Sequence, residues 1–257
     1  MATTLTSSKT GIIIQARMQS KRLPGKVMLP LAGKVPMLCW VVERCLKVKT
    51  ADKVIVATSK HPKDDVIVSY CHQHGYAHFR GSETDVLSRY NACAREFGLE
   101  AIVRITSDCP FISPEMVDRC IQLLHRTKSD FVHNARLDRI FPLGLGIEVI
   151  TMDALARINK LAKKPAEREH VTFYAYEHAK DFRIHELKSL RGYHAGQLRL
   201  TVDTQADFEV ASLVAKEFQS KGVLVDTKEV IRFLNRRPEI TAINQSIKQT
   251  KIHGKVI

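Results

Sequence analysis

The chain has 257 residues, of which 44% are hydrophobic. This content excludes a disordered chain and is enough for one large α/β domain or two small ones. The 40 basic and 27 acidic residues give a formal net charge of +13, which would normally indicate nucleic acid or an anionic membrane as a partner. However, the first 50 residues carry nine basic and one acidic side chain, the last thirty carry seven and two, and the 177 residues between them sum to zero.

The six cysteines are scattered, without a CxxC pair or zinc-ligand spacing, which predicts reduced thiols. We expect Cys109 to shape the backbone rather than to act as a nucleophile. The cysteines expected to serve as packing residues are Cys39, Cys45, Cys93 and Cys120. Residues 1–10 form a polar segment that lacks the apolar stretch of a signal peptide, and no run approaches the roughly 18 apolar residues of a membrane span. These features predict a soluble cytoplasmic protein.

Strand-like and helix-like segments alternate about five times in the first 125 residues. In chain order, strands are predicted at 11–16, 53–58, 76–79 and 101–106. Amphipathic or capped segments predict helices at 37–47, 64–75, 83–97 and 113–125, the last with Ser113 as N-cap and Pro114 at its first position. This order is typical of a mostly parallel sheet with helices on both faces, which binds ligands at the carboxyl ends of its strands.

The pattern loosens from residue 130. Strands are expected at 130–135, 146–151, 183–188 and 198–202. Helices are expected at 152–163, 166–178, 205–220 and 227–235. Residues 238–257 are basic and weakly periodic, which predicts a mobile C-terminal tail.

The segment ARMQSKRLPGK, residues 16–26, follows the first expected strand and places four cations at the carboxyl edge of the sheet without any acid. These cations are Arg17, Lys21, Arg22 and Lys26. A polyphosphate suits them, since backbone N–H groups near Gly25 can approach its oxygens. The arginines can form bidentate hydrogen bonds to a phosphate, and the lysines contribute a localised positive charge. The segment is neither a Walker A sequence nor a GxGxxG fingerprint. A solvated basic loop is the alternative that composition leaves open.

The sequence resembles the cytidylyltransferase family that includes CMP-KDO synthetase and the CMP-sialic acid synthetases, and it is most similar to the spore coat polysaccharide biosynthesis protein F group. The resemblance rests on QARMQSKRLPGKVMLPLAGK, FRGSETDVLSRY, VRITSDCPFISPEMVDR, GLGIEV, EREHVTFY and RLTVDTQADFE, which occur in this order. It implies a Rossmann-like three-layer nucleotidyltransferase domain over residues 11–237, with a sugar-pocket and dimerisation excursion at 130–200. It also implies a homodimer that joins a sugar to a nucleoside monophosphate and releases pyrophosphate.

The resemblance assigns the residues at the transferred phosphate. It implies that Arg22 and Lys26 are catalytic and face the triphosphate, with Arg17 as a further contact and the main chain of Ala16 beside the base. It also implies that Asp108 and Asp203 are catalytic ligands of Mg²⁺, the expected cofactor. Ser107 stands where the family usually has glycine, and without the resemblance Asp203 would be read as a helix N-cap.

Further family positions concern the base, the ribose and the acceptor. In RGSETDV, the residues that match the base and ribose segment are Arg80, Gly81, Ser82 and Asp85. The alternative is that Ser82 caps a helix beginning at Glu83. Arg104 and Thr106 share one strand face, and a nucleotide or an internal carboxylate could be their partner.

The residues that match the sugar pocket are Glu148, Arg168, Glu169 and His170. Arg168 could pair with the carboxylate of a sugar acid, whereas surface ion pairs along a helix are the alternative. Gly146 replaces an aspartate of the commoner GLDVEV, which removes a possible sugar contact.

The combined expectation is a Mg²⁺-dependent enzyme that activates a sugar or sugar acid with CTP for surface polysaccharide or glycoconjugate biosynthesis. A guanylyltransferase, or an enzyme that uses another NTP, remains open, because nothing in composition or spacing separates the bases. A nucleotide- or sugar-binding homologue without activity is a second alternative. A nucleic-acid partner is not expected, because aromatic interleaving and recognised binding motifs are absent.

Overall fold

A computed structural model of the chain describes residues 9–134, 140–249, 251–252 and 255–256. Its main sheet has seven strands in the order β5-β4-β1-β6-β8-β7-β9. The strands, in chain order, are β1 (Thr10–Gln15), β4 (Lys53–Ser59), β5 (Ala77–Gly81), β6 (Ala101–Thr106), β7 (Phe131–His133), β8 (Glu148–Thr151) and β9 (Ile184–Glu186). β8 is antiparallel to both of its neighbours, whereas the other pairs are parallel. The predicted α/β class with a mostly parallel mixed sheet is confirmed.

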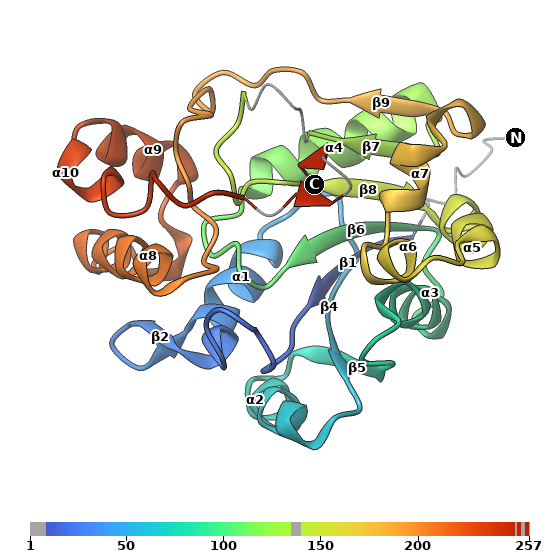
Figure 1. The fold of residues 1–257 in the computed structure, drawn as a ribbon, viewed down its shortest axis with the longest axis horizontal. Coiled ribbons are helices and arrows are strands. Elements are labelled where there is room, and N and C mark those ends of the chain that lie inside the picture. Colours follow the sequence, from blue (N-terminus) through green and yellow to red (C-terminus); the bar gives the residue numbers. More distant parts are fainter. Residues whose placement is uncertain (1–8, 135–139, 250, 253–254, 257) are drawn as a thin grey trace, which may run out of the picture.

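Helices cover both faces of this sheet (Figure 1). The helices are α1 (Met37–Cys45), α2 (Asp65–His74), α3 (Val86–Glu96), α4 (Pro114–Thr127), α5 (Met152–Leu161), α6 (Pro165–Glu169), α7 (Phe173–Glu177), α8 (Gln205–Glu217), α9 (Thr227–Asn235) and α10 (Pro238–Thr241). Two small antiparallel pairs stand apart from the main sheet, β2 (Pro30–Ala32) with β3 (Val35–Pro36) and β10 (Lys251–Ile252) with β11 (Lys255–Val256). Short 3₁₀ turns occupy Lys26–Met28, Pro62–Asp64, Ala179–Asp181 and Gly222–Leu224.

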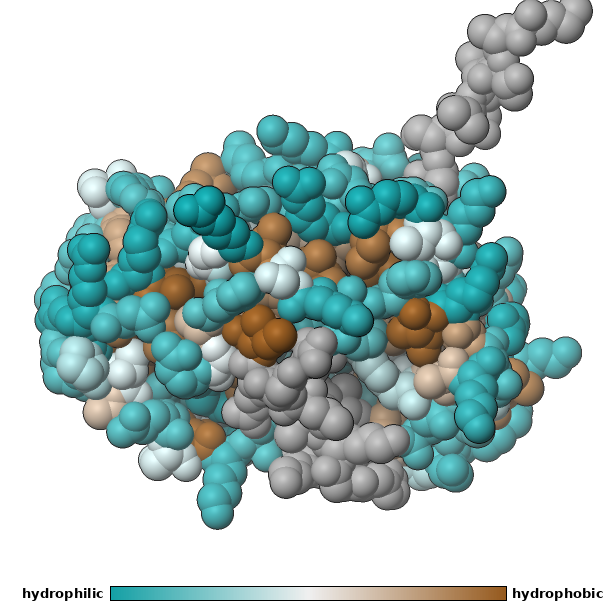
Figure 2. All heavy atoms as spheres, turned by 90° about the horizontal axis from the view of Figure 1, so that it is seen from above, coloured by the Kyte–Doolittle hydropathy of each residue, from teal (hydrophilic) through white to brown (hydrophobic). Residues whose placement is uncertain are grey.

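The alternation of side chains along β1 separates two apolar cores. Ile12 and Ile14 pack in one core with residues of α1, α2, α4, α8 and α9. Ile13 packs in the other with residues of α3, α5 and α7. Because successive strand residues point to opposite faces, Gln15 lies on the same face as Ile13. The face of the molecule seen in Figure 2 is mostly hydrophilic with scattered apolar groups, and no described helix is long and apolar enough to cross a membrane.

Two elements differ from their predicted boundaries in ways that affect the site. The strand predicted at 198–202 does not form, and only a single bridge joins Leu143 to Arg199. Instead the segment runs beside residues 143 and 108, where the N–H of Leu200 donates to Leu143 O and that of Val202 to Asp108 O. The helix predicted at 166–178 is divided into α6 and α7, because the backbone leaves the helical conformation at His170 (φ −106°, ψ 84°).

The prediction of a mobile tail is wrong for residues 238–249. Ile240 and Asn244 are buried, and Asn244 donates to the backbone of Arg199 and to Asp207. Farther up the chain, the buried guanidinium of Arg44 donates to three backbone carbonyls and to Thr227. These bonds tie α1 to the turn before α9, whereas the bonds of Asn244 hold the segment after it.

Candidate active site

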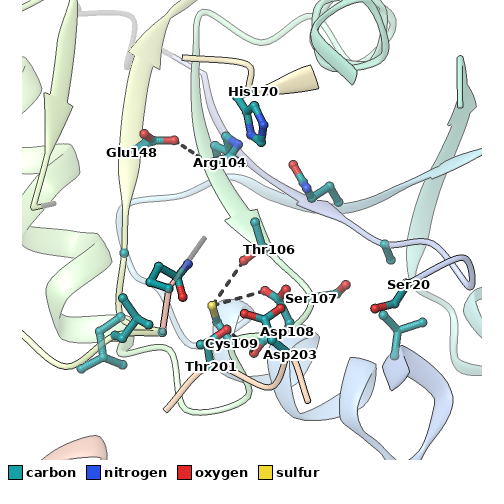
Figure 3. Close-up of a pocket in the computed structure, with 18 of the residues that line it drawn as sticks. Ser20, Arg104, Thr106, Ser107, Asp108, Cys109, Glu148, His170, Thr201 and Asp203 are labelled. Carbon is teal, nitrogen blue, oxygen red and sulfur yellow. Dashed lines mark hydrogen bonds and ion pairs between the residues drawn. The ribbon is translucent and has the colours of Figure 1, made fainter. Parts of the chain in front are cut away.

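A cavity of about 630 Å³ lies at the carboxyl edge of β1 and β6. The loop after β1 contributes Ala16, Arg17, Lys21, Arg22 and Lys26, and β6 with the loop after it contributes Arg104, Thr106 and Asp108. Figure 3 shows Arg104, Glu148 and His170 at one end of this cavity, with Thr106 between them and the group formed by Cys109, Asp108, Asp203 and Thr201. A cavity is thus present at the strands' carboxyl ends, where ligand binding is predicted.

Lys26 joins the two predicted metal carboxylates. Its Nζ lies 2.9 Å from Asp108 Oδ2 and 3.0 Å from Asp203 Oδ1, and it also donates to the carbonyl of Val202 at 2.7 Å. Lys26 is buried, with 7% of its surface exposed. Residues 26, 108 and 203 are far apart in sequence, so this cluster exists only because the fold brings three separate segments to one point.

The sequence at the end of the β1 loop turns Lys26 inward. Gly25 adopts a left-handed conformation (φ +71°), which a residue with a side chain adopts only at a cost, and its N–H donates to the carbonyl of Met18 at 2.8 Å. The next residues form the 3₁₀ turn at Lys26–Met28. This bend carries Lys26 from the loop into the interior, whereas Arg17 stays largely accessible at the rim.

Burial and charge act in opposite directions on this cluster. Burial lowers the pKa of Lys26, but the carboxylates of Asp108 and Asp203 outweigh it and raise the pKa above its ordinary value. Burial raises the pKa of Asp108, but the Lys26 ammonium and the hydrogen bonds that the carboxylate accepts outweigh it and hold the pKa below its ordinary value. Both shifts favour the charged forms of Lys26 and Asp108 at neutral pH.

Asp203 is held by two arginines in addition to Lys26. Its Oδ2 lies 3.2 Å from the Nη2 atoms of both Arg22 and Arg199. The N-cap interpretation of Asp203 is wrong, because Thr204 caps α8 and its hydroxyl accepts from the N–H of Asp207. The side chain of Asp203 is therefore free to face the cavity. Of the four cations in the basic loop, Arg22 and Lys26 are balanced by this carboxylate.

The other end of the cavity is built on a buried ion pair between β6 and β8. Arg104 Nη1 lies 2.7 Å from Glu148 Oε2, and the other carboxylate oxygen accepts from the hydroxyls of Thr172 and Tyr176. Burial raises the pKa of Glu148, but Arg104 and these hydroxyls outweigh it and lower the pKa below its ordinary value. The internal-carboxylate alternative for Arg104 is thus observed. Both side chains also line the cavity.

Glu169 and His170 reach the cavity where α6 ends. Glu169 Oε1 lies 3.9 Å from Arg17 Nη2, across the mouth of the site. Burial is the main cause that lowers the pKa of His170, which keeps its imidazole neutral at pH 7. Cys109 is buried beside Thr106 and Asp108, and burial raises the pKa of its thiol, in agreement with a non-nucleophilic role.

Within the RGSETDV segment, Val86 lines the cavity, whereas the four residues predicted to contact the base and ribose do not. Arg80 donates to the carbonyls of Ser59 and His61 and pairs with Asp65, so its guanidinium is engaged outside the cavity, and its contact with the base stays a prediction. The alternative that Ser82 caps a helix beginning at Glu83 is also wrong. The helix begins at Val86, and Asp85 accepts from the N–H of Ser88 as its cap. The cap is displaced because Ser82 Oγ accepts from the N–H of Asp85 itself.

Arg168 also points away from the cavity. It forms a bidentate contact with Asp85 Oδ2, at 2.6 Å from Nη2 and 3.1 Å from Nε, and it donates to Asn159. Its donors join α6 to the start of α3, and its contact with a sugar carboxylate stays a prediction. The same pair occupies Oδ2 of Asp85, a residue predicted to lie at the base and ribose.

Several cavity residues escaped the sequence analysis. They include Gln15, Arg89, Asn134, Thr201 and Gln249. Arg89 carried a usable signal, because a cation stands within the apolar stripe of α3 formed by Val86, Tyr90 and Cys93. Gln249 carried none, since only the packing of the C-terminal segment places it near the site.

Known proteins resemble this chain over most of its length. A family model described as cytidylyltransferase matches residues 11–235. The chain belongs to the cytidylyltransferase family. It is 38% identical over 237 residues to protein MJ1063 of Methanocaldococcus jannaschii. This match covers 92% of this chain and 95% of that protein. It is 36% identical over 233 residues to the spore coat polysaccharide biosynthesis protein SpsF of Bacillus subtilis, covering 88% and 94% respectively.

Solved structures show the same family and fold. A cytidylyltransferase from Leptospira borgpetersenii has a TM-score of 0.86 and 32% identity, over 94% of this chain and all of that one. CMP:2-keto-3-deoxy-manno-octonic acid synthetase, solved with CTP, has a TM-score of 0.61 and 22% identity, over 82% of this chain and all of that one, and shows the fold alone. The cytidylyltransferase family assigns the chain to the nucleotidyltransferase enzymes.

Proposed function

We propose that this cytidylyltransferase-family protein transfers CMP from CTP to a sugar or sugar acid. A hydroxyl oxygen of the acceptor forms a bond to the α-phosphorus, the bond between that phosphorus and the bridging oxygen breaks, and pyrophosphate leaves with the electron pair while the hydroxyl proton is released. The observation that carries this proposal is the buried cluster of Lys26, Asp108 and Asp203 within the cavity.

The chain's own residues divide the work between the two ends of the cavity. Lys26 and Arg22 supply positive charge where negative charge develops on the triphosphate, and such preorganised donors are the main source of catalysis in phosphoryl transfer. Their present partners are carboxylates of the protein, so bound phosphate oxygens compete for the same donors. At the other end, His170 and the pair of Arg104 and Glu148 offer polar groups to the acceptor.

The donor set also fits Mg²⁺. Among the described residues, no three or more His, Cys, Asp and Glu side chains are grouped to hold a metal ion. Magnesium needs fewer protein ligands, because it is bound by one or two carboxylates and completes its shell with waters and substrate phosphates. Asp108 and Asp203 would hold it, and the bound ion would neutralise charge on the phosphates. Because both carboxylates contact Lys26, the ammonium and the cation share one anionic site.

CTP and a sugar acceptor are favoured by the relatives. The 3-deoxy-manno-octulosonate cytidylyltransferase of a Psychrobacter strain is 35% identical over 129 residues, which cover 47% of this chain. SpsF, matched over most of its length, is named for spore coat polysaccharide biosynthesis. Both names indicate sugars as acceptors and support the expected place in surface polysaccharide synthesis.

A screen of pyrophosphate release tests this function. The four NTPs are combined with Mg²⁺ and a panel of sugar acids, aminosugars and neutral sugars. We expect release with CTP and at least one acceptor, and release about 10²- to 10³-fold slower by Lys26→Ala under the same conditions. Release with another NTP alone would replace CTP in the proposal, and CTP binding without turnover on any acceptor would favour the inactive binding homologue.

A further inference from the structure

Arg89 is a buried cation with no charged partner among the described residues. It is 2% exposed, and no carboxylate of the described part of the chain lies within 4.0 Å of it. Its Nη1 donates to the carbonyl of Ser82 at 2.8 Å, whereas its Nε has no hydrogen-bond partner there. Burying an arginine without a counterion is costly. A ligand group that accepts from the guanidinium would offset this cost.

The cavity provides access to that ligand. Arg89 lines the cavity with Val86, one turn before it on α3. The RGSETDV segment holds the arginine there, because Ser82 accepts from it and Gly81 leaves room for its stem. A Cβ added at Gly81 would lie 2.7 Å from Arg89 Cγ. The segment therefore serves as the support of Arg89 rather than as a direct contact.

Gln15 supplies the complementary polar group. Its Oε1 is buried without a hydrogen-bond partner among the described residues, and it lines the same cavity. Gln15 lies on the sheet face that α3 covers, since Ile13 two residues earlier packs with Val86, Leu87 and Tyr90. Across the ladder it pairs with Thr106 of β6 and Ala57 of β4. Both residues thus line one cavity from neighbouring elements, and each has a buried polar atom without a hydrogen-bond partner among the described residues.

We infer that Arg89 and Gln15 read the nucleobase. A cytosine edge offers a carbonyl and a ring nitrogen that accept hydrogen bonds and an amine that donates one, which matches a guanidinium beside an amide oxygen. This pair lies at α3 and β1, in the parallel half of the sheet, whereas the Arg104 and Glu148 pair lies toward the antiparallel β8. Nucleotides bind at the carboxyl ends of parallel strands next to the loop that holds their phosphates, which here is the loop after β1.

Equilibrium binding of three probes tests this inference, which rests on the proposed use of CTP. Affinities for CMP, UMP and inorganic triphosphate are measured by calorimetry for the wild type, Arg89→Met and Gln15→Leu. We expect Arg89→Met to weaken CMP about 10- to 100-fold, the loss typical of a charge-assisted hydrogen bond, with triphosphate affinity unchanged. Gln15→Leu should weaken CMP more than UMP, because uracil has no amine to donate to the amide.

Matched variants separate binding from folding. Arg95→Met removes an exposed arginine from the same helix and should leave all three affinities unchanged. If Arg89→Met does not fold, Arg89→Lys keeps the stem and the charge but lacks the fork, and it should still weaken CMP several-fold.

Two results would overturn the assignment. A folded Arg89 variant with wild-type CMP affinity would make Arg89 structural, and an equal loss of triphosphate affinity would make it a phosphate contact. If the wild type binds a different nucleoside monophosphate instead of CMP, the choice of CTP fails. The effect of Arg89→Met on the affinities for that nucleotide and for triphosphate then tests the role of Arg89.

Discussion

Arg199 and Asp207 form a buried bidentate pair, with Nε and Nη2 of the arginine 2.6 Å and 3.1 Å from the two carboxylate oxygens. Asp207 Oδ2 also accepts from the backbone N–H of Asp203, and the same Nη2 of Arg199 contacts the Asp203 carboxylate. The pair therefore fixes both the main chain and the side chain of Asp203. Its members are positioning residues.

Asp207→Ala should destabilise the fold by about 3–5 kcal/mol, because Arg199 is left buried without its partner. It should also raise the Mg²⁺ concentration needed for half-maximal pyrophosphate release, through the displaced Asp203. Denaturant unfolding and a Mg²⁺ titration measure the two effects. Arg183→Met breaks an exposed pair with Asp130 and is the control, with an expected loss below about 1 kcal/mol. An Asp207→Ala enzyme with an unaltered Mg²⁺ requirement would contradict the positioning role.

Lys26→Ala should lower kcat by about 10²- to 10³-fold, the loss typical of one preorganised donor at the developing charge. Steady-state kinetics with CTP measure the change. Lys21→Ala removes a neighbouring exposed cation of the same loop and should have a much smaller effect on kcat. Near-normal turnover of Lys26→Ala would remove Lys26 from the catalytic machinery.

Asp108→Asn and Asp203→Asn should each reduce Mg²⁺-dependent turnover, because the amide is a weaker ligand for a hard cation than the carboxylate. The measurement is pyrophosphate release as a function of Mg²⁺ concentration. Glu115→Gln changes a partly exposed carboxylate on α4 that pairs with Lys228, and it serves as the control. The metal assignment fails if both aspartate variants keep the metal dependence of the wild type.

Gly81→Ala should destabilise the protein by about 1–3 kcal/mol, because the new methyl group overlaps the Arg89 stem and the neighbouring ring of Phe79. Displacement of Arg89 should also weaken CMP binding. Thermal unfolding and calorimetry detect the two effects. At Gly146 an added Cβ meets nothing within 4 Å, so Gly146→Ala should leave stability unchanged. Equal stability of the two variants would show that the packing at Gly81 is not tight.

Glu148→Gln should lose about 3–5 kcal/mol at pH 7, since Arg104 then lacks its buried counterion. The pKa of Glu148 is lowered from its ordinary value of 4.5, so the stability from its ionised form is complete above pH 4.5 and is lost as the pH falls through the folded pKa. The gap in unfolding free energy between wild type and variant should therefore be constant above pH 4.5 and narrow below it. Urea titrations across this range provide the test, and a gap that widens on acidification would refute it.

The order of strands and helices could be predicted because each element of the parallel half carries a strong local pattern. The basic loop and Asp108 could be located for the same reason, since the carboxyl edge of a parallel sheet follows directly from the alternation. The roles of Arg80 and Arg168 could not, because each reaches its carboxylate through a tertiary contact that no spacing encodes. Asp203 was predicted to be a metal ligand from the family resemblance. The contacts by which Arg199 and Asp207 hold it are seen only in the structure.

The support of Asp203 reaches into the C-terminal segment, where Asn244 donates to Asp207 and Gln249 accepts from Arg199. A fragment ending after α9 would contain every residue proposed to contact the phosphates. It would still lack the hydrogen bonds that Asn244 and Gln249 form with Asp207 and Arg199. During synthesis, a nascent chain would therefore pass through a stage in which its sheet is complete but its catalytic carboxylate is loosely held.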